Sequence, residues 1–151
     1  MKAVIQRVRS ANVVVEGKTV GSIGQGLLIF LGVAQGDSEA ETLMLAEKIL
    51  KLRIFSDENG KMNRSVLDVG GEVLVVSQFT LLANCRHGNR PDFLESAPPE
   101  IANRLYESFK SIVKQTIGKV ECGIFGADMQ VTLVNDGPVT ILLDTETLKK
   151  K

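Results

Sequence analysis

Residues 27–33 constrain the fold of this chain more than any other stretch. They read LLIFLGV, apolar or glycine throughout, and are rich in residues typical of strands. A strand that is apolar at every position is buried on both faces, so other layers must cover it on each side. The chain has 151 residues, 44% of them hydrophobic, which suits one domain with one sizeable core.

Further strands are predicted from runs of β-branched residues around this central strand. Residues 3–15 are rich in Val and predict one long strand that bends near residues 10–12, and the turn at Glu16-Gly17-Lys18 returns residues 19–23 as its hairpin partner. Shorter strands are expected at residues 52–55, 72–76, 119–124, 129–134 and 138–143, and residues 63–68 are compatible with either strand or loop.

Two segments have the apolar spacing of helices. The first begins after Ser38, which forms a capping box with Glu41, and the second begins at Pro98-Pro99 and ends at Gly118. The expected buried stripes are Leu43, Ala46, Ile49 and Leu50 in the first helix, and Ile101, Leu105, Phe109, Ile112 and Val113 in the second.

Eight or nine strands with only two helices predict an α/β fold. We expect a single compact domain over residues 1–151, built from mixed, mainly antiparallel sheets that are barrel-like and layered β/β/α. The two helices should cover one face, and residues from about 146 to 151 are expected to be a frayed basic tail.

Charge and cysteine content limit the possible binding partners and the possible cellular compartment. Lys plus Arg and Asp plus Glu both number 18, so the net charge is zero and disfavours a broad electrostatic grip on a long nucleic acid, though not on a short end. Two cysteines without a secretory signal indicate a reducing, cytoplasmic location. No apolar run approaches the ~18 residues of a membrane span.

Polar residues end one of the buried strands. The strand at residues 72–76 runs into Ser77-Gln78-Phe79-Thr80, which places hydroxyl, amide and backbone N–H groups at its mouth. Buried polar groups need partners, so this mouth is either bonded internally or open to a ligand. Taken alone, the motif favours an internally bonded strand end, just as Asp136-Gly137 alone favours a hairpin turn.

Conventional catalytic centres are poorly supported. One histidine and two cysteines, Cys85 and Cys122, rarely form a zinc site, so no metal is expected. Ser77, His87 and Asp92 can be combined into a triad, but they lack the pattern of a nucleophile elbow. Thr80 has no evident base beside it to activate its hydroxyl. The sequence instead indicates catalysis by backbone N–H donors and a positioned water.

Two motifs together resemble those of the D-aminoacyl-tRNA deacylases, the family of D-tyrosyl-tRNA(Tyr) deacylase. They are Ser77-Gln78-Phe79-Thr80-Leu81 and Gly137-Pro138-Val139-Thr140. The resemblance extends from the N-terminal MKAVIQRV through Gly88-Asn89-Arg90-Pro91 and Phe125-Gly126-Ala127-Asp128-Met129. A joint match over this span is far more specific than either motif.

The resemblance implies an enzyme that hydrolyses the ester between a D-amino acid and the 3′-terminal adenosine of tRNA, and that also removes glycine mischarged on tRNA(Ala). It implies a homodimer without a cofactor or a metal. Ser77, Gln78, Phe79 and Thr80 would line the pocket of one subunit. Gly137-Pro138 of the other subunit, with a cis peptide, would exclude L side chains. The tRNA 3′ end would contact Arg86, Arg90, Phe125 and Met129.

The chemistry of such a reaction suits this sequence. An aminoacyl ester is already activated, and its vicinal 2′-hydroxyl assists water, so orientation and the N–H groups of Phe79 and Thr80 suffice. Two alternatives stay open: a non-catalytic module that binds an RNA end or a nucleotide through the same arginines and aromatics, and an esterase with Thr80 as its nucleophile.

Overall fold

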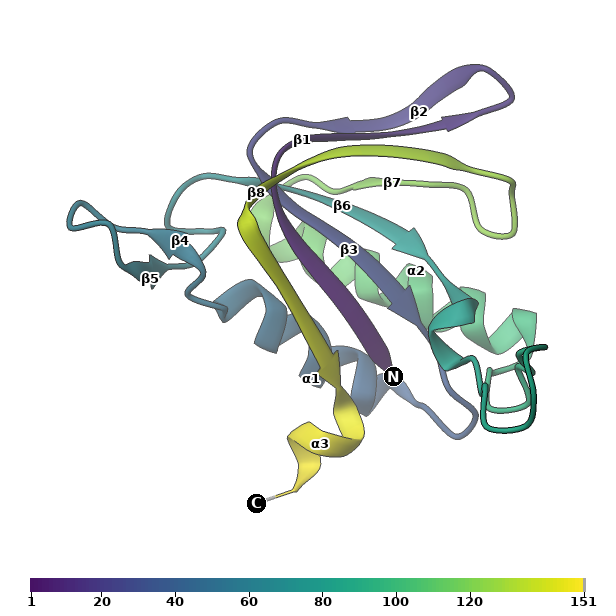
Figure 1. Ribbon diagram of the computed structural model, residues 1–151. Helices are drawn as coiled ribbons and strands as arrows, with labels where there is room; N and C mark the ends of the chain where they lie inside the picture. Colours follow the sequence, from purple (N-terminus) through teal and green to yellow (C-terminus); the bar gives the residue numbers. More distant parts are fainter. Residues whose placement is uncertain (151) are drawn as a thin grey trace.

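A six-stranded mixed sheet organises residues 1–150, the part of the chain that the computed structural model describes (Figure 1). Its order is β2-β1-β3-β6-β7. β2 and β3 share one edge of β1, and β8 pairs with the opposite edge. The strands are β1 (Lys2–Val15), β2 (Lys18–Ile23), β3 (Gly26–Gly32), β6 (Glu72–Ser77), β7 (Glu121–Cys122) and β8 (Gln130–Asp144), while β4 (Phe55–Ser56) and β5 (Met62–Arg64) form a separate hairpin.

The long strand β1 joins the two parts of the sheet. Along one side it pairs with β8, and along the other its first half pairs with β3 and its second half with β2. Register shifts on both sides of Val8 mark the change between the halves, close to the bend predicted at residues 10–12. Only the pairs β3–β6 and β6–β7 are parallel, so the predicted mixed, mainly antiparallel sheet is confirmed.

The sheet curls until it nearly closes into a barrel. A Cβ atom at Gly21 of β2 would lie 2.7 Å from the carbonyl oxygen of Cys122 in β7, so the two backbones almost touch. The interior of this curl is filled by a buried cluster: Val8, Ala11, Val13, Ile23, Leu28, Leu74 and Val76. The β1–β2 hairpin thus forms a second layer over β3 and β6 (Figure 1).

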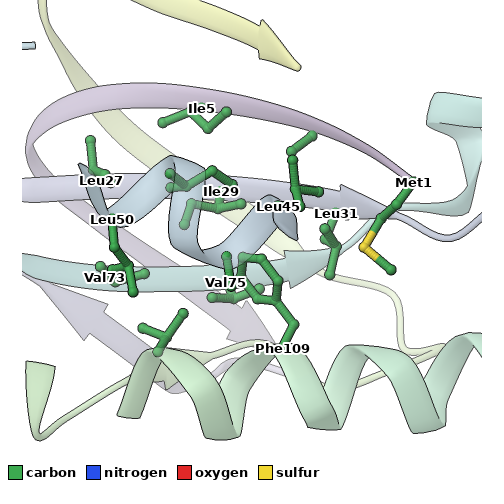
Figure 2. Close-up of a cluster of buried hydrophobic side chains, with 14 of the residues drawn as sticks. Met1, Ile5, Leu27, Ile29, Leu31, Leu45, Leu50, Val73, Val75 and Phe109 are labelled. Atoms are coloured by element: carbon green, nitrogen blue, oxygen red, sulfur yellow. The ribbon is translucent and has the colours of Figure 1, made fainter. Parts of the chain in front are cut away.

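Helices α1 (Glu39–Lys51) and α2 (Pro99–Ile117) cover the other face of the sheet (Figure 1). Their side chains meet those of β1, β3 and β6 in the main hydrophobic core, which includes Leu45 and Leu50 of α1, Phe109 of α2, and Ile29 and Val75 of the sheet (Figure 2). β3 is therefore buried on both faces, and the expected layers β/β/α are present.

The sequence predicted the helix ends more accurately than it predicted the buried helix faces. The capping box is formed, with Glu41 Oε2 accepting the N–H of Ser38 at 2.7 Å. Two stripe residues are wrong, however, because Leu43 is 47% exposed and Ile101 is 37% exposed. The other predicted stripe residues are buried or partly buried. The buried apolar faces, together with Thr42, comprise Leu45, Ala46, Ile49 and Leu50 in α1, and Ala102, Leu105, Tyr106, Phe109 and Val113 in α2.

The end of the chain differs from two expectations. The strands expected at residues 129–134 and 138–143 are one continuous strand, β8, which begins at Gln130, so Asp136-Gly137 is no hairpin turn. Helix α3 (Thr145–Lys149) occupies most of the expected frayed tail, capped by Asp144, whose Oδ1 accepts the N–H of Glu146 at 3.0 Å. Lys149 Nζ lies 2.6 Å from a carboxylate oxygen of Glu41, which ties α3 to α1; Lys151 falls outside the described residues.

Candidate active site

Ser77-Gln78-Phe79-Thr80 lies where β6 leaves the sheet. Ser77 pairs with Leu31 of β3, and the N–H of Gln78 donates to the carbonyl oxygen of Leu31 at 2.8 Å. The chain then turns into a short 3₁₀ helix, η1 (Phe79–Leu82), packed against Gly32. A Cβ atom at Gly32 would lie 2.6 Å from the Leu82 side chain, so glycine permits this close approach.

The turn leaves two backbone donors at its start. In η1 the first internal bond runs from the N–H of Leu81 to the carbonyl oxygen of Gln78 at 3.2 Å. The preceding N–H groups, those of Phe79 and Thr80, have no acceptor within such a helix. The Gln78 side chain does not cap them, and its amide instead donates to the hydroxyl oxygen of Thr80.

A cavity of about 750 Å³ opens beside this turn. Ser77, Gln78 and Phe79 form one wall, the start of α2 forms a second, and residues 125–129 form a third. Phe79 is 56% exposed, and its ring meets that of Phe93 edge-on, with centroids 5.0 Å apart. The cavity therefore combines an aromatic wall with the polar end of a strand, and it brings together Ser77, Gln78, Phe79, Phe125 and Met129, whose roles stay predictions.

One buried phenol supports the third wall. The Tyr106 ring lies behind Phe125, with centroids 6.1 Å apart, and its hydroxyl donates to the carbonyl oxygen of Val75 at 3.1 Å. Burial raises the pKa of Tyr106 far above its usual value, so the phenol stays protonated and neutral. Tyr106 therefore lies between Phe125 and the backbone of β6.

Five residues expected at the site do not line this cavity: Thr80, Arg86, Arg90, Gly137 and Pro138. Thr80 follows the lining residue Phe79 in the sequence and is exposed. Arg86 and Arg90 are exposed in a loop closed by a pair of backbone bonds between Asn84 and Asp92, 2.8 and 3.0 Å long. Their contact with RNA stays a prediction.

Gly137-Pro138 lies in an outward bulge of β8 and has a cis peptide bond. Gln6 pairs with Thr140 and Val8 with Asn135, so residues 136–139 stand opposite the single residue Arg7 of β1. Both Gly137 and Pro138 are exposed. The bulge therefore presents this dipeptide to the outside of its own chain.

The two motifs are well separated within one chain. Ser77 pairs with Leu31, which pairs with Ala3, whereas Gly137 stands opposite Arg7. This places them four residues apart along the strands and three strands apart across the sheet, about 20 Å when followed along the sheet at ordinary strand spacings. The dipeptide does not line the cavity of its own chain.

Side chains from β1 and β8 fix the bulge. Arg7 Nε donates to the carbonyl oxygen of Asp136 at 2.9 Å, and its NH1 nitrogen donates to the carbonyl oxygen of Ile54 at 2.6 Å. Asn135 Nδ2 donates to the carbonyl oxygens of Arg7 and Val139, both at 3.1 Å. Neither Arg7 nor Asn135 was predicted as a site residue.

Several lining residues were also missed, among them Val33, Phe93, Ser96, Ala102 and Asp128. Phe93 carried a usable signal, because it is an aromatic residue within the polar, irregular segment at residues 83–95. Ser96 carried none, since its importance lies in a tertiary bond: its hydroxyl donates to the carbonyl oxygen of Phe79 at 3.2 Å.

The structure does not assemble the alternative centres. The Asp92 carboxylate accepts the N–H of Leu94 at 3.2 Å, His87 is exposed in the loop, and no hydrogen bond joins either residue to partly buried Ser77 among residues 1–150. Across residues 1–150, no group of three or more His, Cys, Asp or Glu residues is placed to hold a metal ion, and both cysteines are free thiols. Within the same residues, no helix has the length and apolar character needed to cross a membrane.

Comparison with known proteins identifies the family. The family model for D-Tyr-tRNA(Tyr) deacylase matches residues 4–144. This chain belongs to that family. Relatives in this family include the D-aminoacyl-tRNA deacylase of Thermosipho africanus, 62% identical over 97% of this chain and 98% of that protein. The D-aminoacyl-tRNA deacylase of Dictyoglomus turgidum is 58% identical over 99% of this chain and 96% of that protein.

Solved structures share the deacylase fold described above. One titled c-Myc DNA Unwinding Element Binding Protein superimposes with a TM-score of 0.90, at 45% identity over 95% of this chain and 98% of its own. A second, described as a probable eukaryotic D-amino acid tRNA deacylase, has a TM-score of 0.80 at 16% identity, over 94% of this chain and 97% of its own. That second likeness concerns the fold alone.

Proposed function

We propose that this chain hydrolyses the ester bond of D-aminoacyl-tRNA and releases free D-amino acid and tRNA, as a proofreading enzyme of translation. The observation that carries this proposal is full-length membership of the D-Tyr-tRNA(Tyr) deacylase family, with relatives near 60% identity that bear the name D-aminoacyl-tRNA deacylase. The cavity beside Ser77, Gln78 and Phe79 is the site that suits this reaction.

The proposed chemistry uses backbone donors. The N–H groups of Phe79 and Thr80 face no acceptor within η1, so they are suited to the negative charge that develops on the ester oxygen. The substrate supplies the rest, because its ester is activated and its 2′-hydroxyl assists the attacking water. The Thr80 hydroxyl already accepts a bond from Gln78 and has no base beside it that would make it a nucleophile.

The cavity also suits the end of a tRNA. Its volume, about 750 Å³, lies within the usual range for small-molecule sites, ~300–1,000 Å³, and can hold a terminal nucleoside with its amino acid. Phe79, Phe93 and Phe125 offer faces and edges on which an adenine can stack. Arg86 and Arg90 would reach the phosphates from the adjoining loop.

A homodimer would complete the site. Gly137-Pro138 is exposed and does not line the cavity of its own chain, so it would be free to enter the cavity of a second copy. There its rigid backbone would occupy the space of an L side chain and leave D-amino acids and glycine free to enter. The enzyme would then also clear glycine mischarged on tRNA(Ala).

The proposed enzyme works in the cytoplasm, where charged tRNA is available. Its thiols fit that compartment, because Cys85 and Cys122 are both free and a reducing environment keeps them so.

A non-catalytic nucleic-acid-binding role is the second candidate. It is favoured by the 45% identical structure whose title names a DNA-unwinding-element binding protein. The deciding experiment incubates the purified chain with matched D- and L-aminoacyl-tRNA and measures the free amino acid released. Release from the D-charged tRNA supports the enzyme, whereas binding without release supports the second role. A trapped acyl group on Thr80 would replace the water mechanism with that of a covalent esterase.

A further inference from the structure

The Ser96 side chain lies between the wall of the cavity and the backbone of η1. Ser96 lines the cavity and is partly buried, and its hydroxyl donates to the carbonyl oxygen of Phe79 at 3.2 Å. A 3₁₀ helix takes its own bonds from N–H groups three residues further along the chain, so the bond from Ser96 is an additional one from outside the helix. A carbonyl oxygen has two lone pairs and can accept both.

This carbonyl group belongs to the same peptide unit as one of the proposed oxyanion donors. The C=O of Phe79 and the N–H of Thr80 are the two ends of one planar group, and in a trans peptide they point in opposite directions. A bond that fixes the oxygen therefore also fixes the direction of the Thr80 N–H. The same bond strengthens that N–H as a donor, because hydrogen bonds in a chain polarise one another.

The other proposed donor is held from within the helix. The N–H of Phe79 shares its peptide unit with the carbonyl oxygen of Gln78, which accepts the N–H of Leu81 at 3.2 Å. The backbone of η1 thus orients the Phe79 donor, whereas a side chain from a later part of the sequence contributes to the orientation of the Thr80 donor.

The segment at residues 95–97 is fixed to the end of β3. Two backbone bonds, 2.8 and 3.0 Å long, and a β-bridge join it to residues 33–35, which directly follow β3. Gly32, the last residue of β3, packs against η1. One strand end therefore holds both partners of the bond between Ser96 and Phe79, and a site held by such a rigid element keeps its geometry.

We propose that Ser96 is a positioning residue for deacylation: its hydroxyl orients and polarises the Phe79–Thr80 peptide so that the Thr80 N–H can stabilise the charge that develops on the ester oxygen. This inference rests on the proposed function, because it concerns the same site. The oxyanion exists only in the transition state and the intermediate that follows it, so the effect belongs to the chemical step. Loss of the hydroxyl should therefore lower kcat and leave KM nearly unchanged.

The first test compares the steady-state kinetics of the wild-type chain, Ser96→Ala and Ser96→Thr on D-aminoacyl-tRNA. We expect Ser96→Ala to lower kcat by about ten-fold with KM within about two-fold, because misaligning one donor costs less than the ~10²–10³-fold loss caused by removing one. Ser96→Thr keeps the hydroxyl and should restore most of kcat.

Three outcomes of these kinetics would overturn the positioning role. A raised KM at unchanged kcat would mean that Ser96 binds the substrate directly, since it lines the cavity. Wild-type kinetics in Ser96→Ala would mean that the hydroxyl has no part in the reaction. An equal loss of kcat in Ser96→Ala and Ser96→Thr would mean that the hydroxyl is not the group that matters.

Ser108→Ala is the matched control for a general loss of stability. Ser108 is also partly buried, and its hydroxyl donates to a carboxylate oxygen of Glu39, so it joins the two helices away from the cavity. Each alanine variant loses one hydroxyl bond and should lower the Tm by at most about 4 °C. Only Ser96→Ala should lower kcat; an equal fall in Ser108→Ala would contradict a specific role for Ser96.

The second test needs no substrate. The NMR resonances of the Phe79 carbonyl carbon and the Thr80 amide nitrogen report a bond to the oxygen of this peptide. We expect both to shift in Ser96→Ala, to return towards their wild-type positions in Ser96→Thr, and to stay in place in Ser108→Ala. Unshifted resonances in Ser96→Ala would overturn the inference. If the wild-type chain releases no amino acid from D-aminoacyl-tRNA, the proposed function is wrong, while these resonances still decide whether Ser96 holds the peptide.

Discussion

The Arg7 guanidinium and the carbonyl oxygen of Asp136 are joined by a 2.9 Å hydrogen bond one residue before Gly137-Pro138. The same side chain, 12% exposed, also bonds to the carbonyl oxygen of Ile54. A single arginine thus connects the bulge of β8 to the root of the β4–β5 hairpin. The planar fork of arginine can hold two carbonyl groups at once, which a lysine cannot reproduce.

Arg7→Lys should therefore loosen the bulge while keeping a positive charge. We expect the rate on D-aminoacyl-tRNA to fall roughly ten-fold, with a smaller D-over-L ratio, because a lost charged hydrogen bond costs ~1.5–3 kcal/mol. Arg9→Lys is the matched control, since Arg9 also approaches Asp136, at 3.5 Å, but its side chain is 76% exposed. The measurement is the initial deacylation rate on matched D- and L-charged tRNA. An Arg7→Lys variant with wild-type rates and a wild-type D-over-L ratio would contradict the expectation.

Gly137→Ala should impair D-aminoacyl-tRNA and glycyl-tRNA alike. An added Cβ would lie 2.2 Å from the backbone nitrogen of Val139, so the exposed bulge must change shape. We expect at least a ten-fold loss in rate with an unchanged Tm. Gly24→Ala is the control, because its Cβ would meet nothing closer than the Glu72 carboxylate at 3.4 Å. Sedimentation measures whether each variant still dimerises. Full activity of the Gly137→Ala variant would show that the bulge is not part of the active site.

Thr80→Val should retain most activity, because the proposed working group of Thr80 is its backbone N–H. The substitution removes the hydroxyl that accepts a bond from Gln78, so a loss within about ten-fold is expected. A drop on the order of 10⁴-fold, as for a true nucleophile, would establish covalent catalysis instead. Single-turnover rates with D-aminoacyl-tRNA provide the measurement.

Binding of tRNA should depend only weakly on salt. The formal net charge is zero, so few phosphates are neutralised. The log–log slope of affinity against salt should correspond to fewer than about six phosphate contacts, and Arg90→Ala should reduce its magnitude by about one. A steep slope that Arg90→Ala leaves intact would mean that the enzyme grips the acceptor stem elsewhere.

Glu41→Gln should make stability less dependent on pH in the acid range. Hydrogen bonds from Lys149 and then Ser38 lower the pKa of Glu41 from 4.5 to about 2. A lowered carboxyl pKa stabilises the fold above pH 4.5, and this contribution disappears as the pH falls towards 2. At pH 7 the variant should melt about 2–4 °C lower, and the gap should close between pH 4.5 and 2. Glu47→Gln, exposed on the same helix, should show no such convergence.

Local patterns predicted the parts of the fold that local forces decide. The capping box at Ser38, the apolar strand β3 and the turn before β2 all follow from neighbouring residues. Leu43 and Leu45 are both apolar, and only packing against the sheet decides that Leu45 is the buried one. In β8, pairing with β1 on both sides of the bulge overrides the turn preference of Asp136-Gly137.

The residues of the site also fall into those that the sequence predicted and those that only tertiary contacts reveal. Ser77, Gln78 and Phe79 line the cavity, but the polar strand end alone favoured internal bonding, and only the resemblance of the joined motifs predicted a site there. Arg7 and Ser96 act through bonds to carbonyl groups 129 and 17 residues away in sequence. Neither residue type is unusual in its local surroundings, so no sequence pattern marks them.

The pairing of β1 with β8 delays completion of the sheet during synthesis. Lys2 pairs with Asp144 and Val14 with Gln130, so β8 leaves the ribosome well after its partner β1. At ~5–20 residues per second, that strand spends several seconds or more with one edge unpaired. Its Val-rich sequence is then open to other nascent chains. A transcript cut short before codon 130 would yield a product whose exposed edge can never be covered, and which is a target for chaperones and proteases.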